Sequence, residues 1–99
     1  MDLKRAGMAG TLESSDIMVV VEPREEEGIE IYLESPVEKQ FGDQIRKVIL
    51  DTLNELGICK AVLRAKDKGA LDCVIKARIQ TAVYRGAASK DYLWGEVKR

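Results

Sequence analysis

Few side chains in this chain could carry out chemistry on their own. Its 99 residues include two cysteines, Cys59 and Cys73, and no histidine. Without histidine there is no imidazole base for a Ser-His-Asp or Cys-His triad, and no histidine-based metal site. No set of nucleophile, base or metal ligands is clustered along the sequence, so the residues do not indicate an autonomous enzyme. Two features remain to be interpreted: a serine-containing segment near the amino end and a group of basic residues in the second half.

Three blocks of residues have the order and spacing of one known family. They are Ala-Gly-Thr-Leu-Glu-Ser-Ser-Asp at 9–16, residues 37–43 with Ile45-Arg46, and residues 67–73 with Ala77-Arg78. On these blocks the chain resembles the acyl carrier (gamma) subunit of citrate lyase over most of its length. The resemblance weakens at 1–8, at 23–28 and after Gly86.

The resemblance implies a covalent carrier rather than a catalyst. In that family the serine of a Glu-Ser-(Ser or Gly)-Asp motif carries the prosthetic group, and the matching residue is Ser14, not Ser15. The implied group is 2'-(5''-phosphoribosyl)-3'-dephospho-coenzyme A, joined to the serine oxygen by a phosphodiester, and its thiol bears acetyl and citryl thioesters. The implied partners are an alpha subunit that exchanges acetyl for citryl, a beta subunit that cleaves citryl to oxaloacetate, and a transferase that attaches the group.

The acidic and thiol side chains receive simpler interpretations. Glu13 and Asp16 flank Ser14. We interpret these two carboxylates as solvated charges rather than as residues that the transferase recognises. Cys73 falls on a predicted apolar face and Cys59 follows a predicted helix end, so both are expected to be buried or inert thiols. The start of the chain has no apolar stretch like a secretory signal, which favours free thiols in a reducing compartment, the cytoplasm.

Charge is distributed unevenly along the chain. Residues 1–35 contain nine acidic and three basic residues, and residues 36–99 contain 13 basic and eight acidic residues. Because the total is only −1, pairing of the two halves within the fold is favoured over binding to a polyanion. We also hypothesise that four bases hold cofactor phosphates or dock an acidic partner surface: Arg64, Lys66, Lys76 and Arg78.

The first half predicts a hairpin and a long helix. A β-branched run over 16–22 and an alternating run over 29–34, separated by a polar turn, are typical of two paired strands. A helical stripe then spans 36–56. Ser35 is predicted as its N-cap, with Glu38 closing a capping box, and Gly57 is predicted to end it.

The second half is less regular. Residues 60–66 alternate like a strand and end in the turn signal Asp67-Lys68-Gly69. The apolar residues of 70–79 fit both the two-residue period of a strand and the 3.6-residue period of a helix. We prefer a strand because of the turn at Gly69 and because Arg78 interrupts the helical stripe, and we expect a short helix from there to Arg85.

These elements predict a small α+β domain with the order ββαββ plus a short C-terminal helix. One long helix would cover one face of an antiparallel sheet. The expected divisions are a flexible arm carrying the attachment serine (1–15), a carrier domain (16–88) and a tail (89–99). In the tail, Tyr92-Leu93-Trp94 either packs on the core or docks a partner protein.

Two other functions remain as alternatives. One is a small protein-binding adaptor without a cofactor, which would use the tail. The other is a nucleic-acid-binding module, but its single candidate stacking aromatic, Tyr32, lies between Glu30 and Glu34. We therefore expect no nucleic-acid partner. We expect no membrane association either, because no apolar run approaches the roughly 18 residues of a membrane span.

Overall fold

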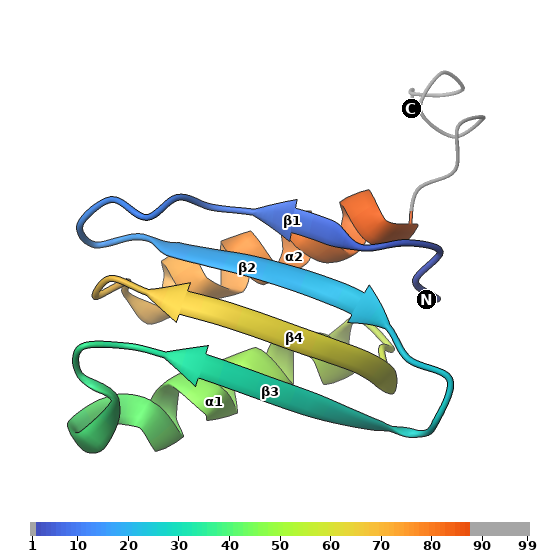
Figure 1. Ribbon diagram of the computed structural model, residues 1–99, viewed down its shortest axis with the longest axis horizontal. Helices are drawn as coiled ribbons and strands as arrows, with labels where there is room; N and C mark the ends of the chain where they lie inside the picture. The colour runs from blue at the N-terminus through green and yellow to red at the C-terminus, as the bar shows by residue number, and fades with distance from the viewer. Residues whose placement is uncertain (1, 88–99) are drawn as a thin grey trace.

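Four strands and two helices make up the part of the chain that the computed structural model describes, residues 2–87 (Figure 1). The α+β class predicted from the sequence is confirmed. The element order is βββαβα: β1 Gly7–Ala9, β2 Ile17–Pro23, β3 Gly28–Glu34, α1 Glu38–Glu55, β4 Lys60–Asp67 and α2 Asp72–Ala87.

The sheet is mixed rather than antiparallel, with strand order β1-β2-β4-β3. β2 pairs antiparallel with both β1 and β4, whereas β3 and β4 are parallel. The predicted hairpin between the second and third strands is therefore wrong, because β4 lies between them. The physical reason is the crossover: α1 carries the chain from the end of β3 back along the sheet, and a strand that follows such a helix pairs in parallel.

Helix α1 confirms the predicted long helix but not its predicted start. Val37 occupies the N-cap and no side chain caps it; Glu38 instead pairs with Arg46 at 2.6 Å. The helix ends as predicted at Gly57, whose φ of 74° is left-handed. The amides of Gly57 and Ile58 donate to the carbonyl oxygens of Asn54 (3.0 Å) and Leu53 (2.9 Å), which is the Schellman arrangement.

Helix α2 replaces the strand predicted over 70–79, so that prediction is wrong. The buried positions of α2 follow the helical period: Ile75, Ile79, Ala82, Val83 and Gly86. Arg78, which seemed to break this stripe, lies beside it and reaches toward β2. The helix runs through Gly86 to Ala87 instead of ending at Arg85.

Part of the predicted arm belongs to the sheet. Gly7–Ala9 form β1 at one edge, and the amides of Lys4 and Arg5 donate to the carbonyl oxygen of Gly86 at 2.8 and 3.1 Å. The predicted tail, 89–99, with Tyr92-Leu93-Trp94, lies outside the described residues.

Both helices pack on the same face of the sheet (Figure 1), and the core lies between these two layers. Its fully buried large side chains alternate along β2 and β4 and recur along the helices. They are Ile17, Val19, Val21, Ile49, Leu53, Leu63, Ile75, Ile79 and Val83. The opposite face of the sheet is covered by neither helix (Figure 1).

Candidate functional site

Ser14 lies in the loop that joins β1 to β2, at one end of the sheet (Figure 1). Its side chain is exposed. Within residues 2–87 the Ser14 hydroxyl has no hydrogen-bond partner. A second protein could therefore reach this oxygen without breaking an existing contact.

Asp16, two residues further on, holds this loop together from inside. The residue is only 9% exposed. Its Oδ2 accepts a hydrogen bond from the Thr11 hydroxyl at 2.7 Å, and its Oδ1 accepts one from the Ile17 amide, also at 2.7 Å. Both ends of the loop are thus tied to one carboxylate.

The same carboxylate forms an ion pair with Arg78 of α2. Arg78 Nε donates to Oδ1 at 3.0 Å and Nη2 donates to Oδ2 at 2.8 Å, which is the two-pronged geometry that suits a guanidinium. These bonds, with that from Thr11, hold the pKa of the Asp16 carboxyl well below its usual range, and the pKa of Arg78 is raised. The interpretation of Asp16 as a solvated charge is wrong, whereas Glu13 is exposed as expected.

Backbone geometry completes the loop. Gly10 has a φ of 98°, and a side chain there would place its Cβ 1.8 Å from the Ile17 carbonyl oxygen. Ser15 is left-handed as well, with φ 66°. The Ser15 amide donates to the carbonyl oxygen of Lys68, and the Lys68 amide donates to that of Asp16, both at 2.8 Å. Ser14 therefore sits on a fixed turn beside the connection between β4 and α2.

A second buried carboxylate, Asp67, joins the other connections at this end of the sheet. Its Oδ2 accepts from the Ser35 hydroxyl at 2.8 Å, and its Oδ1 accepts from the Ala70 amide at 2.9 Å. Ser35 Oγ in turn accepts from the Val37 amide at 3.2 Å. The sequence indicated only a turn at 67–69 and gave no sign that the Asp67 side chain joins the β3–α1 and β4–α2 connections.

The four bases singled out from the sequence do not form one patch. Arg64 and Lys66 lie on the uncovered face of β4, whereas Lys76 and Arg78 belong to α2, where Lys76 pairs with Glu55 at 3.2 Å. Within residues 2–87, neither glutamate on the open face of β3 forms an ion pair with any of these four bases. Glu34 lies beside Lys66 in the strand register, but Glu30 pairs with Arg24 at 3.6 Å.

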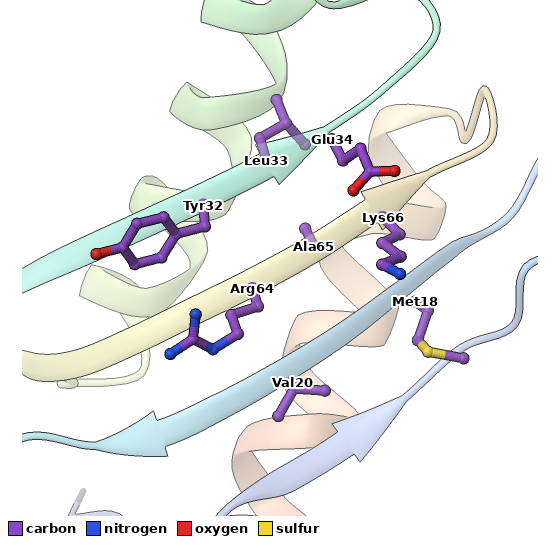
Figure 2. Close-up of a pocket in the computed structure, with 8 residues that line it drawn as sticks. All are labelled: Met18, Val20, Tyr32, Leu33, Glu34, Arg64, Ala65 and Lys66. Carbon is purple, nitrogen blue, oxygen red and sulfur yellow. The ribbon is translucent and has the colours of Figure 1, made fainter.

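Arg64 and Lys66 border a shallow pocket of about 360 Å³ on the open face of the sheet (Figure 2). Met18, Val20 and Tyr32 are also among its lining residues. The pocket is thus lined by the two cationic side chains of β4, Arg64 and Lys66, together with the aromatic ring of Tyr32 and apolar side chains.

The remaining candidates do not add a catalytic centre. Cys59 and Cys73 are free thiols, as predicted, but both are exposed, so of the two expectations, buried or inert, burial is wrong and inertness stays a prediction. Over residues 2–87, no group of three or more Cys, Asp or Glu side chains is arranged to hold a metal ion. Neither α1 nor α2 is long and apolar enough to span a membrane.

Comparison with known proteins defines the class. The family model described as acyl carrier protein, malonate decarboxylase delta subunit (MdcD), matches residues 4–86. Curated relatives place the chain more closely. A citrate lyase acyl carrier protein of Streptococcus mutans is 59% identical, over 98% of this chain and 95% of its own. One from Latilactobacillus sakei is 52% identical, over 100% and 97%. This chain belongs to the family of citrate lyase acyl carrier proteins.

Solved structures show the same fold in more distant proteins. A chain from the crystal structure of a Pseudomonas malonate decarboxylase hetero-tetramer in complex with malonate superposes with a TM-score of 0.66, at 15% identity over 81% of each chain. Homoserine kinase from Cytophaga hutchinsonii gives a TM-score of 0.54 at 13% identity, over 91% of this chain and 37% of its own. At these identities the likeness concerns the fold alone.

Proposed function

We propose that this chain is the acyl carrier subunit of citrate lyase and that Ser14 is the point at which its prosthetic group is attached. The observation that carries the proposal is the exposed Ser14 hydroxyl, which has no partner among residues 2–87, on a loop held by Asp16. The family membership supports the same residue, because Ser14 occupies the serine position of the family's Glu-Ser-(Ser or Gly)-Asp motif.

The residues present fit a group joined through a phosphodiester. A primary alcohol can form that bond, and the exposure of Ser14 leaves space for a large substituent. The group, 2'-(5''-phosphoribosyl)-3'-dephospho-coenzyme A, supplies a thiol that bears acetyl and citryl thioesters while citrate is cleaved to acetate and oxaloacetate. The chain contributes the tether point: Thr11, Asp16 and Arg78 keep Ser14 at the end of the sheet.

In this proposal the chain is a carrier in a multi-subunit cytoplasmic enzyme. The alpha subunit carries out acyl exchange, the beta subunit carries out cleavage, and a separate transferase attaches the group. A fixed loop suits this arrangement, because three different proteins must then approach the same small region of this chain. A preformed loop reduces the ordering cost at each of these encounters.

Intact mass tests the proposal directly. Protein produced with its modifying enzymes should be heavier than the unmodified chain by the mass of the coupled group, and the added mass should lie on the peptide that contains Ser14. A modified chain should then support citrate cleavage by the other two subunits. Native protein that carries no added mass at Ser14 while the complex still cleaves citrate would refute the proposal.

A further inference from the structure

The open face of the sheet carries two cross-strand rows of side chains at the Ser14 end. In the strand register, Glu34, Lys66 and Met18 form the first row, and Tyr32, Arg64 and Val20 form the second. All six side chains line the pocket shown in Figure 2, where they project from neighbouring strands. With both helices on the other face, the pocket is open to solvent.

The second row presents an aromatic ring beside a cation. The Arg64 guanidinium lies 5.1 Å from the centre of the Tyr32 ring, and Tyr32 is 53% exposed. Arg64 also contacts Glu22 at 3.3 Å, in an ion pair that is exposed and therefore weak. A planar base could stack on Tyr32, and Arg64 could turn from Glu22 to a stronger anion.

The first row adds a second cation, Lys66. Lys66 is exposed, and its ammonium forms no ion pair with any residue in 2–87. Met18 and Val20 lie beside it as an apolar floor. Two cations, an aromatic ring and an apolar floor are the features that bind a nucleoside diphosphate. Glu34 also lines the pocket, and Glu22 and Glu30 lie nearby, so only these two cations are available to an anion, which suits one diphosphate better than a long polyanion such as RNA.

The position of the pocket relative to Ser14 matches a tethered ligand. Met18 is four residues from Ser14, so their backbones are separated by at most about 14 Å. The second row is about 7 Å further along the strands. The pocket thus begins within about 14 Å of the Ser14 backbone, so a group attached at Ser14 starts near it.

We propose that this pocket binds the nucleotide half of the group attached at Ser14, with Lys66 and Arg64 on the diphosphate and Tyr32 against the adenine. This inference rests on the proposed function. The docked nucleotide would hold the carrier's group along the sheet between visits to the enzyme subunits. Only the pantetheine end and its thiol would then extend freely.

Titration of the unmodified chain with ADP tests the pocket without any attachment. In a two-dimensional NMR titration, ADP should shift the amides of residues 18, 20, 32, 64 and 66 most strongly. The double variant Arg64→Gln/Lys66→Gln should weaken ADP binding about tenfold, because two charge-assisted contacts are lost. Lys60→Gln is the matched control, because Lys60 lies on the same strand at the far end of the sheet, and binding should change less than about twofold.

The modified chain provides the second arm. Its spectrum should differ from that of the unmodified chain at the same five amides, and the double variant should abolish these differences while mass spectrometry still finds the group on Ser14. Absence of added mass would refute the proposed function, and the ADP titration would still decide the pocket. If neither ADP nor the attached group shifts these amides, or if the shifts survive the double variant, the pocket proposal is wrong.

Discussion

Two adjacent serines at the tip of the β1–β2 loop have different structural roles. Ser14 is exposed and unpartnered within the described part of the chain, whereas Ser15 has a left-handed backbone and its N–H donates a hydrogen bond to the Lys68 carbonyl oxygen. Ser14→Ala should therefore abolish attachment of the group while changing the free energy of unfolding by less than about 0.5 kcal/mol. Intact mass after co-expression with the modifying enzymes, together with urea denaturation, measures both.

Ser15→Gly is the matched control and is a prediction in its own right. Glycine adopts a φ of 66° without the steric cost that serine incurs, so this variant should be more stable by about 0.5–1 kcal/mol. It should still accept the group at Ser14. Loss of attachment in Ser15→Gly, with Ser14→Ala still modified, would move the site to Ser15.

Asp16 should make stability depend on pH in a specific direction. Because the pKa of its folded carboxyl is depressed, its contribution to stability is fully present above the unfolded pKa of about 3.9 and is lost as pH falls toward the folded value. Asp16→Asn should lower the free energy of unfolding by about 2 kcal/mol at pH 7. The difference in the free energy of unfolding between the variant and the parent chain should become smaller between pH 4 and pH 2, as measured by urea denaturation at each pH. A gap independent of pH would contradict the ion pair.

Arg78 tests whether the two-pronged contact matters. Arg78→Ala should destabilise the chain by about 1.5–3 kcal/mol, and Arg78→Lys should recover only part of this, because lysine cannot make two parallel bonds. Hydrogen exchange of the Ser15 and Ile17 amides should quicken in both variants. Lys76→Ala, on the same helix in an exposed ion pair, should change stability by less than about 1 kcal/mol.

At the scale of elements, the contact between β1 and α2 is unusually close. A Cβ on Gly7 would lie 1.9 Å from the Ala82 carbonyl oxygen and 2.6 Å from the Gly86 nitrogen, and both are backbone atoms. Gly7→Ala should therefore push β1 from the helix and cost about 1–3 kcal/mol. Met8→Ala is the control, since Met8 is 54% exposed on the same strand. Equal stability of the two variants would argue against this packing.

The elements also show which parts of the fold can be read from sequence. The strands near 17–22, 29–34 and 60–66 and the long helix have clear periods, and all four are present. Residues 70–79 were misassigned because Arg78 was treated as a break in a helical face. That arginine is placed by a distant aspartate, and local periodicity contains no such information. The pairing of β3 with β4 likewise depends on the crossover through α1.

The candidate site also has one part that the sequence indicates and another part that it does not. Ser14 could be singled out because a block of neighbouring residues resembles a family motif. The ion pair between Asp16 and Arg78 joins residues 62 positions apart, and the Asp67 contact with Ser35 spans 32. Neither spacing is periodic, so composition and local pattern could not bring these side chains together. The same limit explains why Lys76 and Arg78 were grouped wrongly with Arg64 and Lys66.

At the scale of the whole molecule, the two faces of the sheet differ in role: one contributes to the core and the other is open. The covered face of the sheet contains the buried core, while the open face carries the charged and aromatic rows around Arg64. Ion pairs join the acidic first half to the basic second half in two ways: Arg78–Asp16 links α2 to the loop before β2, and Arg64–Glu22 links two neighbouring strands of the sheet. These two contacts agree with the interpretation that the halves pair within the fold only in part, because other ion pairs, such as Lys76–Glu55, form within one half.

The placement of Leu3–Arg5 has a practical consequence. These residues contact the last turn of α2 at the Val21 end of β2, whereas the β1–β2 loop, which contains Ser14, lies at the opposite, Ile17 end of the sheet (Figure 1). An affinity handle fused at the amino end would therefore hold the molecule on a sensor chip by the end of the sheet opposite to the Ser14 loop. Subunits injected over such a chip would meet the tether point first, without hindrance from the support.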